Sequence, residues 1–353
     1  MSLLSVIMHV AARRRCLRIG GVHLIADPDA VRDVLTDVSA SFGRCAGGAS
    51  IVDLADVACV RPLWDACNPI HGDIVREEIA TLLRSVCLTS LCGPRDDAFN
   101  ANEAALDAAG HVMMRTVMSP AIFDVGSMHR CVEETVTAAL RHHALSLLPR
   151  WCRPDSGLDE AIVRMRSYVA SMPCPASVPA GMPLDERARA IVALWSHGAT
   201  ALASSIAWLM CSWANDLAVR RLSVDGIVER TLLEHPPLWW IARRALRGRM
   251  VGCTPLVDGC AVTYPYVTIN EGDTVIILPA AAQLIDGRII AFSAGDTRCP
   301  AQHLTVQVLR ELATQLRDQR VDLVPAPGAD LGVEACAVMR PRRPLLVPRH
   351  VQA

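Results

Sequence analysis

The spacing of apolar residues predicts a chain that is mainly α-helical, with a small β portion in its later part. Through the middle of the chain, apolar residues recur three and four positions apart, which is the period of an amphipathic helix. Alternating runs typical of strands come late, at about 262–269 and 274–278, with the turn sequence Asn270 to Asp273 between them. Helices are predicted at about 28–35, 73–90, 100–118, 127–148, 157–172, 184–217 and 224–234.

Local signals sharpen this prediction near the two ends of the chain. A short β-like run from Val22 to Asp27 leads into the first helix, where Asp27 can cap the helix and Pro28 suits its first turn. Near the other end, a helix is predicted after Cys299, and a proline-rich tail follows it. The apolar positions of that later helix are Leu304, Val308, Leu309, Leu312, Ala313 and Leu316.

Composition allows a large hydrophobic core. The chain has 353 residues, of which 52% are hydrophobic and 20% charged, and its mean hydropathy is +0.29. This is enough for one large core or two modest ones, and we expect a single domain over residues 1–353. The formal net charge is −1, which gives no field that would attract nucleic acid or an anionic membrane. We therefore expect no nucleic-acid partner.

The cysteines and the N-terminal segment bear on the compartment. The 14 cysteines form no Cys-x-x-Cys pair and no cluster with zinc spacing. We expect reduced thiols and a cytoplasmic protein. Residues Leu3 to Val10 are mostly apolar, but the run is too short to cross a membrane. No integral membrane anchor is expected, although peripheral association stays an alternative.

The loop that carries Cys299 has the chemistry of an iron ligand. A thiolate at the N-terminus of a helix is favoured by the helix dipole and by unpaired backbone N–H groups. Such a thiolate can serve as the axial ligand of an iron. Gly295 would let the backbone pass close to a flat macrocycle, where a Cβ would collide. The alternative for any single cysteine is a small buried apolar side chain.

This loop resembles the heme loop of the cytochrome P450 family, whose pattern is Phe-x-x-Gly-x-Arg-x-Cys-x-Gly. Phe292, Gly295 and Cys299 fall on matching positions. The resemblance covers roughly residues 20–350. It implies the cytochrome P450 fold, shortened at the N-terminus and in the meander before the heme loop. It also implies heme b, iron protoporphyrin IX, with Cys299 as the axial ligand of the iron.

Two positions of the loop depart from the family pattern. Thr297 stands where the family has an arginine or histidine, and Arg298 lies beside it as a candidate cofactor contact. Ala301 replaces the last glycine, so one small residue replaces another.

Two further segments resemble family contacts to the heme propionates. His111 and Arg115 are four residues apart, on one face of a predicted helix, and two such side chains can hold a carboxylate. Arg243 follows a His-Pro-Pro segment and matches a position from which a guanidinium reaches a propionate. The alternatives are a solvated helix face for the first pair and a surface arginine for Arg243.

Two family motifs are missing. Aligned on the His-Pro-Pro segment, the positions of the family's Glu-x-x-Arg pair hold Arg230 and Leu233. In the long central helix, the positions of the acid and the alcohol hold Thr200 and Ala201. Thr200 is a candidate catalytic hydroxyl, and ordinary helix packing is its alternative. A buried ion pair can be replaced by apolar packing, so the fold does not require the first motif.

The resemblance implies a heme-thiolate monooxygenase that hydroxylates a small or medium apolar molecule with O2. Its electrons would come from a separate ferredoxin or flavoprotein. Two alternatives remain. The first is a degenerate relative that binds heme or a ligand without monooxygenase turnover, and the second is a peroxide-dependent heme enzyme. The missing motifs favour the first of these alternatives.

Overall fold

The chain folds into two compact units, and each is described by itself. The computed structural model describes residues 15–37, 41–44, 71–92, 98–118, 124–146, 157–171, 181–238, 240–252, 257–258, 261–262, 266–290, 292–293, 298–335 and 339–350. The sheet unit comprises Met1–Ala46, Glu229–Cys299 and Glu334–Met339. The helical unit comprises Gly47–Val228, Pro300–Val333 and Arg340–Ala353. The single domain expected over residues 1–353 stays a prediction.

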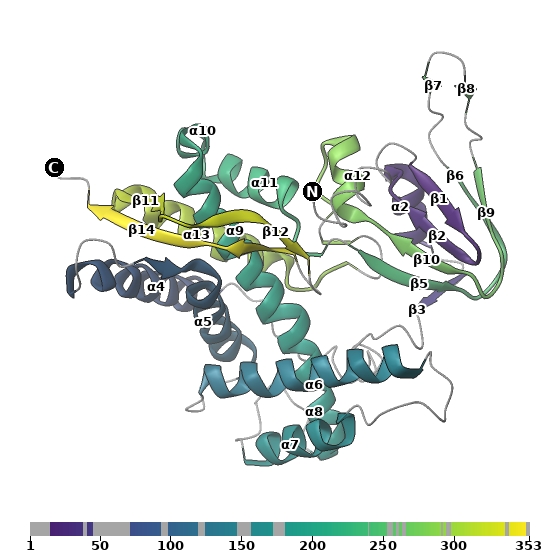
Figure 1. Ribbon diagram of the computed structural model, residues 1–353, viewed down its shortest axis with the longest axis horizontal. Coiled ribbons are helices and arrows are strands. Elements are labelled where there is room, and N and C mark those ends of the chain that lie inside the picture. Colours follow the sequence, from purple (N-terminus) through teal and green to yellow (C-terminus); the bar gives the residue numbers. More distant parts are fainter. Residues whose placement is uncertain are drawn as a thin grey trace. The chain divides into compact units, whose positions relative to one another are not determined.

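A five-stranded sheet organises the sheet unit, with strand order β1-β2-β10-β5-β3 (Figure 1). Neighbouring strands are antiparallel except β2 and β10, which run parallel. This parallel pair joins segments about 250 positions apart in the chain. The strands are β1 (Cys16–Ile19), β2 (Val22–Ile25), β3 (Phe42–Arg44), β5 (Ile241–Ala245) and β10 (Thr274–Ile277).

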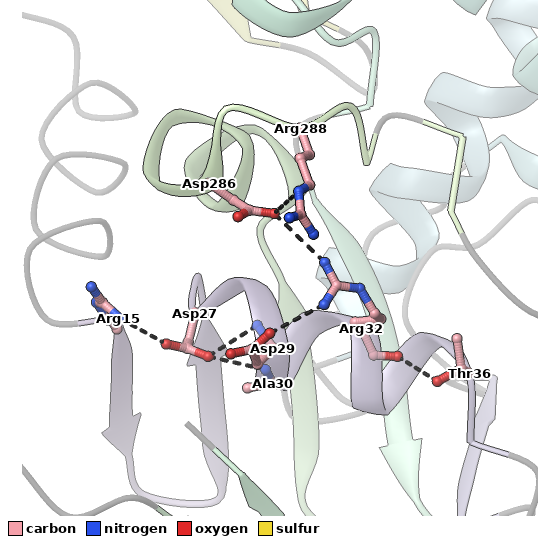
Figure 2. Close-up of polar contacts among 8 residues, drawn as sticks. All are labelled: Arg15, Asp27, Asp29, Ala30, Arg32, Thr36, Asp286 and Arg288. Atoms are coloured by element: carbon pink, nitrogen blue, oxygen red, sulfur yellow. Dashed lines mark hydrogen bonds and ion pairs between the residues drawn. The ribbon is translucent and has the colours of Figure 1, made fainter. Parts of the chain in front are cut away.

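Helix α2 (Pro28–Leu35) begins where the sequence predicts. The Asp27 carboxylate accepts hydrogen bonds from the backbone N–H groups of Asp29 and Ala30, at 3.1 and 3.0 Å (Figure 2). It therefore satisfies two of the N–H groups that a helix leaves unpaired at its start. Arg15 Nη1 lies 3.3 Å from Asp27 Oδ2 and pairs with the same carboxylate. The predicted cap at Asp27 is confirmed.

The apolar face of α2 packs against the sheet, and ion pairs hold its polar side. Arg32 Nη1 lies 3.1 Å from Asp29 Oδ1, and Arg32 Nη2 lies 3.6 Å from Asp286 Oδ2. Arg32 therefore links α2 to α12 (Pro279–Asp286), as Figure 2 shows. Burying a valine or leucine side chain stabilises a fold by about 1.5–3 kcal/mol. The shared core cluster is built from Ile25, Ala30, Val31, Val34, Leu35, Ala245, Val251, Ile269, Val275, Ile277 and Ala282.

The predicted turn at 270–273 forms, but the strands on its two sides do not pair with each other. The Asp273 N–H donates to Asn270 O over 3.1 Å, and Gly272 adopts a φ of 84°, in the left-handed region that favours glycine. Strand β9 (Tyr266–Ile269) pairs with β6 (Arg249–Gly252), whereas β10 joins the five-stranded sheet. Strands β7 (Val257–Asp258) and β8 (Ala261–Val262) form a separate pair.

The helical unit follows the predicted helices closely. Helix α5 packs against α9, α6 packs against α7, and α13 packs against α4 and α9. Helix α11 begins in this unit and ends in the sheet unit. The helices are α4 (Gly72–Cys92), α5 (Ala101–Met113), α6 (Val125–Ser146), α7 (Leu158–Ser171), α8 (Leu184–Leu194), α9 (Thr200–Asn215), α10 (Leu217–Arg220), α11 (Val224–Glu234) and α13 (Gln302–Asp318).

Gly110 marks a close contact between helices of this unit. A Cβ built at Gly110 would lie 2.5 Å from Val125 Cγ1 and 3.0 Å from Trp195 Cη2. Real Cβ contacts are essentially never shorter than 3.0 Å. Only glycine therefore lets α5 approach α6 and the central helix this closely.

The segment predicted as a proline-rich tail contains strands. Strand β14 (Leu345–His350) pairs with β11 (Val321–Pro325) and, at its start, with β4 (Phe99–Asn100). Strand β12 (Asp330–Ala335) pairs with β13 (Met339–Arg343). Pro348 lies beyond the short contact with β4, so its ring occupies a stretch of β14 with a paired strand on one side.

Candidate functional site

The loop around Cys299 is closed by a backbone hydrogen bond. The Cys299 N–H donates to Phe292 O over 2.8 Å, and the Ser293 N–H donates to Ile290 O over 2.9 Å. The Phe292 side chain is buried, and the Cys299 side chain is partly exposed. Ser293 adopts a φ of 62°, which is uncommon for a residue with a Cβ and marks a tight turn. The chain therefore turns sharply and presents the cysteine on a backbone held from both ends.

The structure describes only some of the other predicted residues of this loop. Gly295 and Thr297 lie outside the described residues, so the structure does not test the predicted glycine position. Arg298 is exposed. Leu278, α12 and residues 287–291 stand between β10 and Phe292, and residue 291 is the one position of this connection that the structure does not describe.

The helix that follows the cysteine is α13, and it has the predicted face. All six predicted apolar positions, from Leu304 to Leu316, are buried. Its N-cap residue is Ala301, whose side chain makes no capping hydrogen bond. Two residues, Pro300 and Ala301, separate Cys299 from Gln302, the first residue of the helix.

Arg243 lies in the five-stranded sheet, on the strand between β10 and β3. It belongs to β5, in register with Val275 of β10 and with Arg44 of β3. The side chain is half-buried, and its Nη1 donates to the backbone oxygen of Ala242 over 3.0 Å. The predicted contact of Arg243 with a propionate stays a prediction.

The predicted pair His111 and Arg115 lies at the end of α5. His111 is half-exposed, with Nε2 3.7 Å from Asp107 Oδ1. Arg115 belongs to η2 (Met114–Met118), a π-helical turn that continues α5. Its Nη1 donates to Glu78 Oε1 over 2.6 Å and to Glu77 Oε2 over 2.9 Å, both on α4. These two hydrogen bonds raise the pKa of Arg115. The Arg115 guanidinium is thus already hydrogen-bonded to two carboxylates of this chain.

The long central helix is distorted directly before Thr200. A π-helical turn, η4 (Trp195–Ala199), interrupts it between α8 and α9, and Thr200 is the first residue after this turn. The Thr200 side chain is half-buried, and Gly198 lies buried inside the turn. Single π-turns inside α-helices occur frequently at functional sites, because they re-aim the side chains around them. The sequence pattern predicted the helix but not this turn.

The candidate residues therefore form two groups, one in each unit. Arg243, Phe292 and Cys299 belong to the sheet unit together with Arg298. His111, Arg115 and Thr200 belong to the helical unit, where α5 packs along α9 and η4. The structure brings the members of the second group onto neighbouring elements, whereas Arg243 lies on β5 and the other three residues of the first group lie on the cysteine loop.

Helix α11 has no Glu-x-x-Arg pair, as the sequence predicts. Arg230 instead donates from Nε to Glu234 Oε1 over 2.8 Å, one turn along the same helix. The sequence analysis missed Gln283 of α12, which is fully buried. Its side chain donates to Leu232 O and Leu233 O, at the end of α11, and accepts from the Ile290 N–H. The only sequence signal was the pair of prolines after α11, which removes two backbone donors.

Metal-binding groups and membrane-spanning helices also bear on the site. Among the residues that the structure describes, no group of three or more His, Cys, Asp or Glu side chains could hold a metal ion. Over the same residues, none of the helices combines the length and apolar character needed to cross a membrane.

The structure is similar to solved cytochrome P450 structures over nearly the whole chain. The cytochrome P450 CYP102L1 gives a TM-score of 0.73 at 11% identity, covering 99% of this chain and 100% of that chain. CYP175A1 from Thermus thermophilus gives 0.69 at 14%, with 98% and 95% covered. P450BioI, in complex with an acyl carrier protein ligated to hexadec-9Z-enoic acid, gives 0.70 at 14%, with 98% and 97% covered.

The chain has the cytochrome P450 fold. No protein-family model matches the sequence, and no curated protein matches it. At identities of 11–14% the structural similarity establishes the fold alone. It confirms the predicted fold class and the resemblance to the cytochrome P450 family at the level of the fold, and the activity has to be argued from the residues.

Proposed function

We propose that this protein is a heme-thiolate oxygenase of the monooxygenase type. The observation that carries the proposal is the Cys299 loop, in which a partly exposed thiol sits on backbone fixed by the 2.8 Å bond from Cys299 N–H to Phe292 O. An axial thiolate has to be held in one orientation while its sulfur stays accessible to the iron. The cytochrome P450 fold supports the proposal, because the predicted ligand lies on the loop that resembles the family's heme loop.

The candidate residues of the sheet unit fit a bound heme better than Arg115 of the helical unit does. Cys299 supplies the thiol ligand and buried Phe292 anchors its loop. Half-buried Arg243 supplies a cation suited to a propionate. Arg115 fits less well, because its guanidinium already donates to Glu77 and Glu78. The predicted cofactor is heme b, and the fit rests on Cys299, Phe292 and Arg243.

When bound, heme supplies the iron chemistry that activates O2. Cys299 would ligate the iron as a thiolate, and the thiolate would donate electron density to the iron. Thr200, directly after the π-turn, would hold a hydrogen bond or an ordered water with its hydroxyl. In the family pattern Thr200 stands at the acid position and Ala201 at the alcohol position, so no carboxylate is present at either, and a water would have to carry the proton.

The proposed substrate is a small or medium apolar molecule. Electrons would come from a separate ferredoxin or flavoprotein, and the expected cytoplasmic location would keep the Cys299 thiol reduced. The missing carboxylate and the engaged Arg115 favour a second candidate, a protein that binds heme or a ligand without monooxygenase turnover. A peroxide-dependent heme enzyme is a variant of this second candidate. Such an enzyme needs no electron donor.

The test compares two oxidant supplies on the same heme-loaded protein. One reaction contains a surrogate ferredoxin, its reductase, NADH and isotopically labelled O2, and the other contains hydrogen peroxide alone. A panel of apolar substrates is screened by mass spectrometry. Monooxygenation predicts labelled oxygen in a hydroxylated product of the first reaction. Product in the peroxide reaction alone supports the peroxide variant, and no product in either supports binding without turnover.

A further inference from the structure

Two consecutive prolines leave two backbone carbonyls at the end of α11 without helical partners. The last helical hydrogen bond at the end of α11 runs from the His235 N–H to Thr231 O, over 2.9 Å. The next two donors would belong to residues 236 and 237, which are both prolines and have no N–H. Leu232 O and Leu233 O are therefore the acceptors that lose their donors. Buried carbonyls without a partner are costly, so a side chain has to supply the bonds.

Gln283 supplies both bonds. Its side chain is fully buried, and its Nε2 lies 3.0 Å from Leu232 O and 3.0 Å from Leu233 O. A carboxamide nitrogen carries two N–H donors, which is the number that the two prolines remove. The opposite orientation of the amide would set its oxygen against two carbonyl oxygens, so the bonding pattern fixes the assignment.

The other end of the same amide holds the start of the cysteine loop. Gln283 Oε1 accepts from the Ile290 N–H over 2.7 Å. From there, the Ser293 N–H donates to Ile290 O over 2.9 Å, and the Cys299 N–H donates to Phe292 O over 2.8 Å. A continuous path of backbone and hydrogen bonds thus joins the end of α11, through one side chain, to the residue that carries the thiol.

We infer that Gln283 is the positioning residue that fixes the Cys299 loop to the end of α11. Leu233, whose carbonyl it binds, stands where the cytochrome P450 resemblance places the missing arginine. A neutral, fully satisfied amide therefore connects this helix to the loop without an ion pair, and it does so without burying a charge. The value of this connection for an iron ligand rests on the proposed function, whereas the connection itself does not.

The test uses a length-matched substitution and a matched control. Gln283→Met keeps the length and apolar stem but removes both donors and the acceptor. The control is Gln315→Met, because Gln315 is also buried and donates from Nε2 to a backbone oxygen, that of Arg76, over 3.0 Å. Both variants are compared with the unaltered full-length chain, purified without added heme, at a temperature well below unfolding.

Two local readouts follow the loop directly. Hydrogen exchange of the peptide containing Ile290 and iodoacetamide labelling of Cys299 are both measured by mass spectrometry. Gln283→Met should raise each rate about tenfold, in line with the loss of a buried hydrogen bond, and Gln315→Met should leave each within about twofold. Equal rates at Ile290 and Cys299 in the two variants, at equal loss of thermal stability, would overturn the inference.

A measurement on the unaltered chain covers the case in which Gln283→Met fails to fold. The Ile290 amide should then exchange as slowly as the core amides of α12, and free exchange at Ile290 would refute the bond to Gln283. None of these readouts needs heme. A protein that never binds heme can therefore still support the inference, and a heme-binding protein can still contradict it.

Discussion

Cys299 donates its backbone N–H to the carbonyl oxygen of Phe292, and this 2.8 Å bond closes the loop that carries the candidate iron ligand. The bond depends on the position of Phe292, whose side chain is only 8% exposed. The burial of the Phe292 side chain therefore also fixes the position of the Cys299 thiol.

Phe292→Ala should therefore destabilise the protein by about 3 kcal/mol, because it removes a buried aromatic side chain and leaves a cavity. Urea unfolding followed by circular dichroism measures the change. The control is Tyr266→Ala, whose ring is 56% exposed and whose removal should change stability by no more than about 0.5 kcal/mol. Equal losses in the two variants would show that Phe292 does not anchor the loop.

His235 predicts a pH dependence of stability. Burial lowers the pKa of His235 to about 4, from an ordinary value of 6.5. The unfolded chain therefore binds a proton between these values that the folded chain does not, so stability is lost as the pH falls from about 6.5 to 4. The loss over this window is about 3 kcal/mol if no other group compensates.

Urea midpoints measured between pH 7.5 and 4 test this expectation, with His235→Gln as the variant. The substitution should flatten the part of the profile that lies between pH 6.5 and 4. As a control, His303→Gln changes an exposed histidine on α13 and should keep the slope of the unaltered chain. A profile unchanged by His235→Gln would contradict the assignment of the slope to His235.

Gly110→Ala should destabilise the helical unit although alanine is the better helix former. A Cβ at this position would lie 2.5 Å from Val125 Cγ1, and overpacking of this kind costs about 1–3 kcal/mol. The gain in helix propensity is only about 1 kcal/mol. Thermal unfolding measures the balance, and a higher midpoint for Gly110→Ala would contradict the close packing of α5.

The matched control for this experiment is Gly72→Ala at the first residue of α4. The nearest atom to a Cβ there is the end of the flexible Gln307 side chain, at 3.4 Å. Without a clash, this substitution should leave the midpoint unchanged or raise it slightly.

Two thiols should differ strongly in reactivity. Burial raises the pKa of Cys211 to about 12, which leaves almost no thiolate at neutral pH, whereas the Cys299 side chain is partly exposed. Iodoacetamide at pH 8, followed by peptide mass spectrometry, should label Cys299 in the folded protein purified without added heme, and Cys211 only after unfolding in urea. Labelling of Cys211 at the same rate in the folded state would contradict the packing of α9.

The sequence predicted most helices because their apolar faces are local patterns. Helix α2 begins and ends where expected, and the buried face of α13 consists of the predicted residues. The sequence could not show that β10 pairs with β2 rather than with β9, because that choice depends on residues about 250 positions away. The strands of the tail were missed because prolines lower the signal of a strand.

The candidate site was predictable only where its chemistry is local. Cys299 and Phe292 lie in one short motif, and the absence of an acid at the position of Thr200 is visible in the sequence. Gln283 has no motif, since its role arises from two prolines that lie about 47 positions earlier in the chain. The glutamates that hold Arg115 lie on another helix, so the helix face of Arg115 did not reveal them.

The most direct test of the central claim is a carbon monoxide difference spectrum of the dithionite-reduced protein, expressed with heme supplied. The account predicts a red-shifted Soret band of the thiolate type, which Cys299→Ser abolishes and Cys211→Ser leaves intact. A colourless protein that remains folded by circular dichroism, or a thiolate band that survives Cys299→Ser, would contradict the assignment of Cys299 as the ligand of a heme iron.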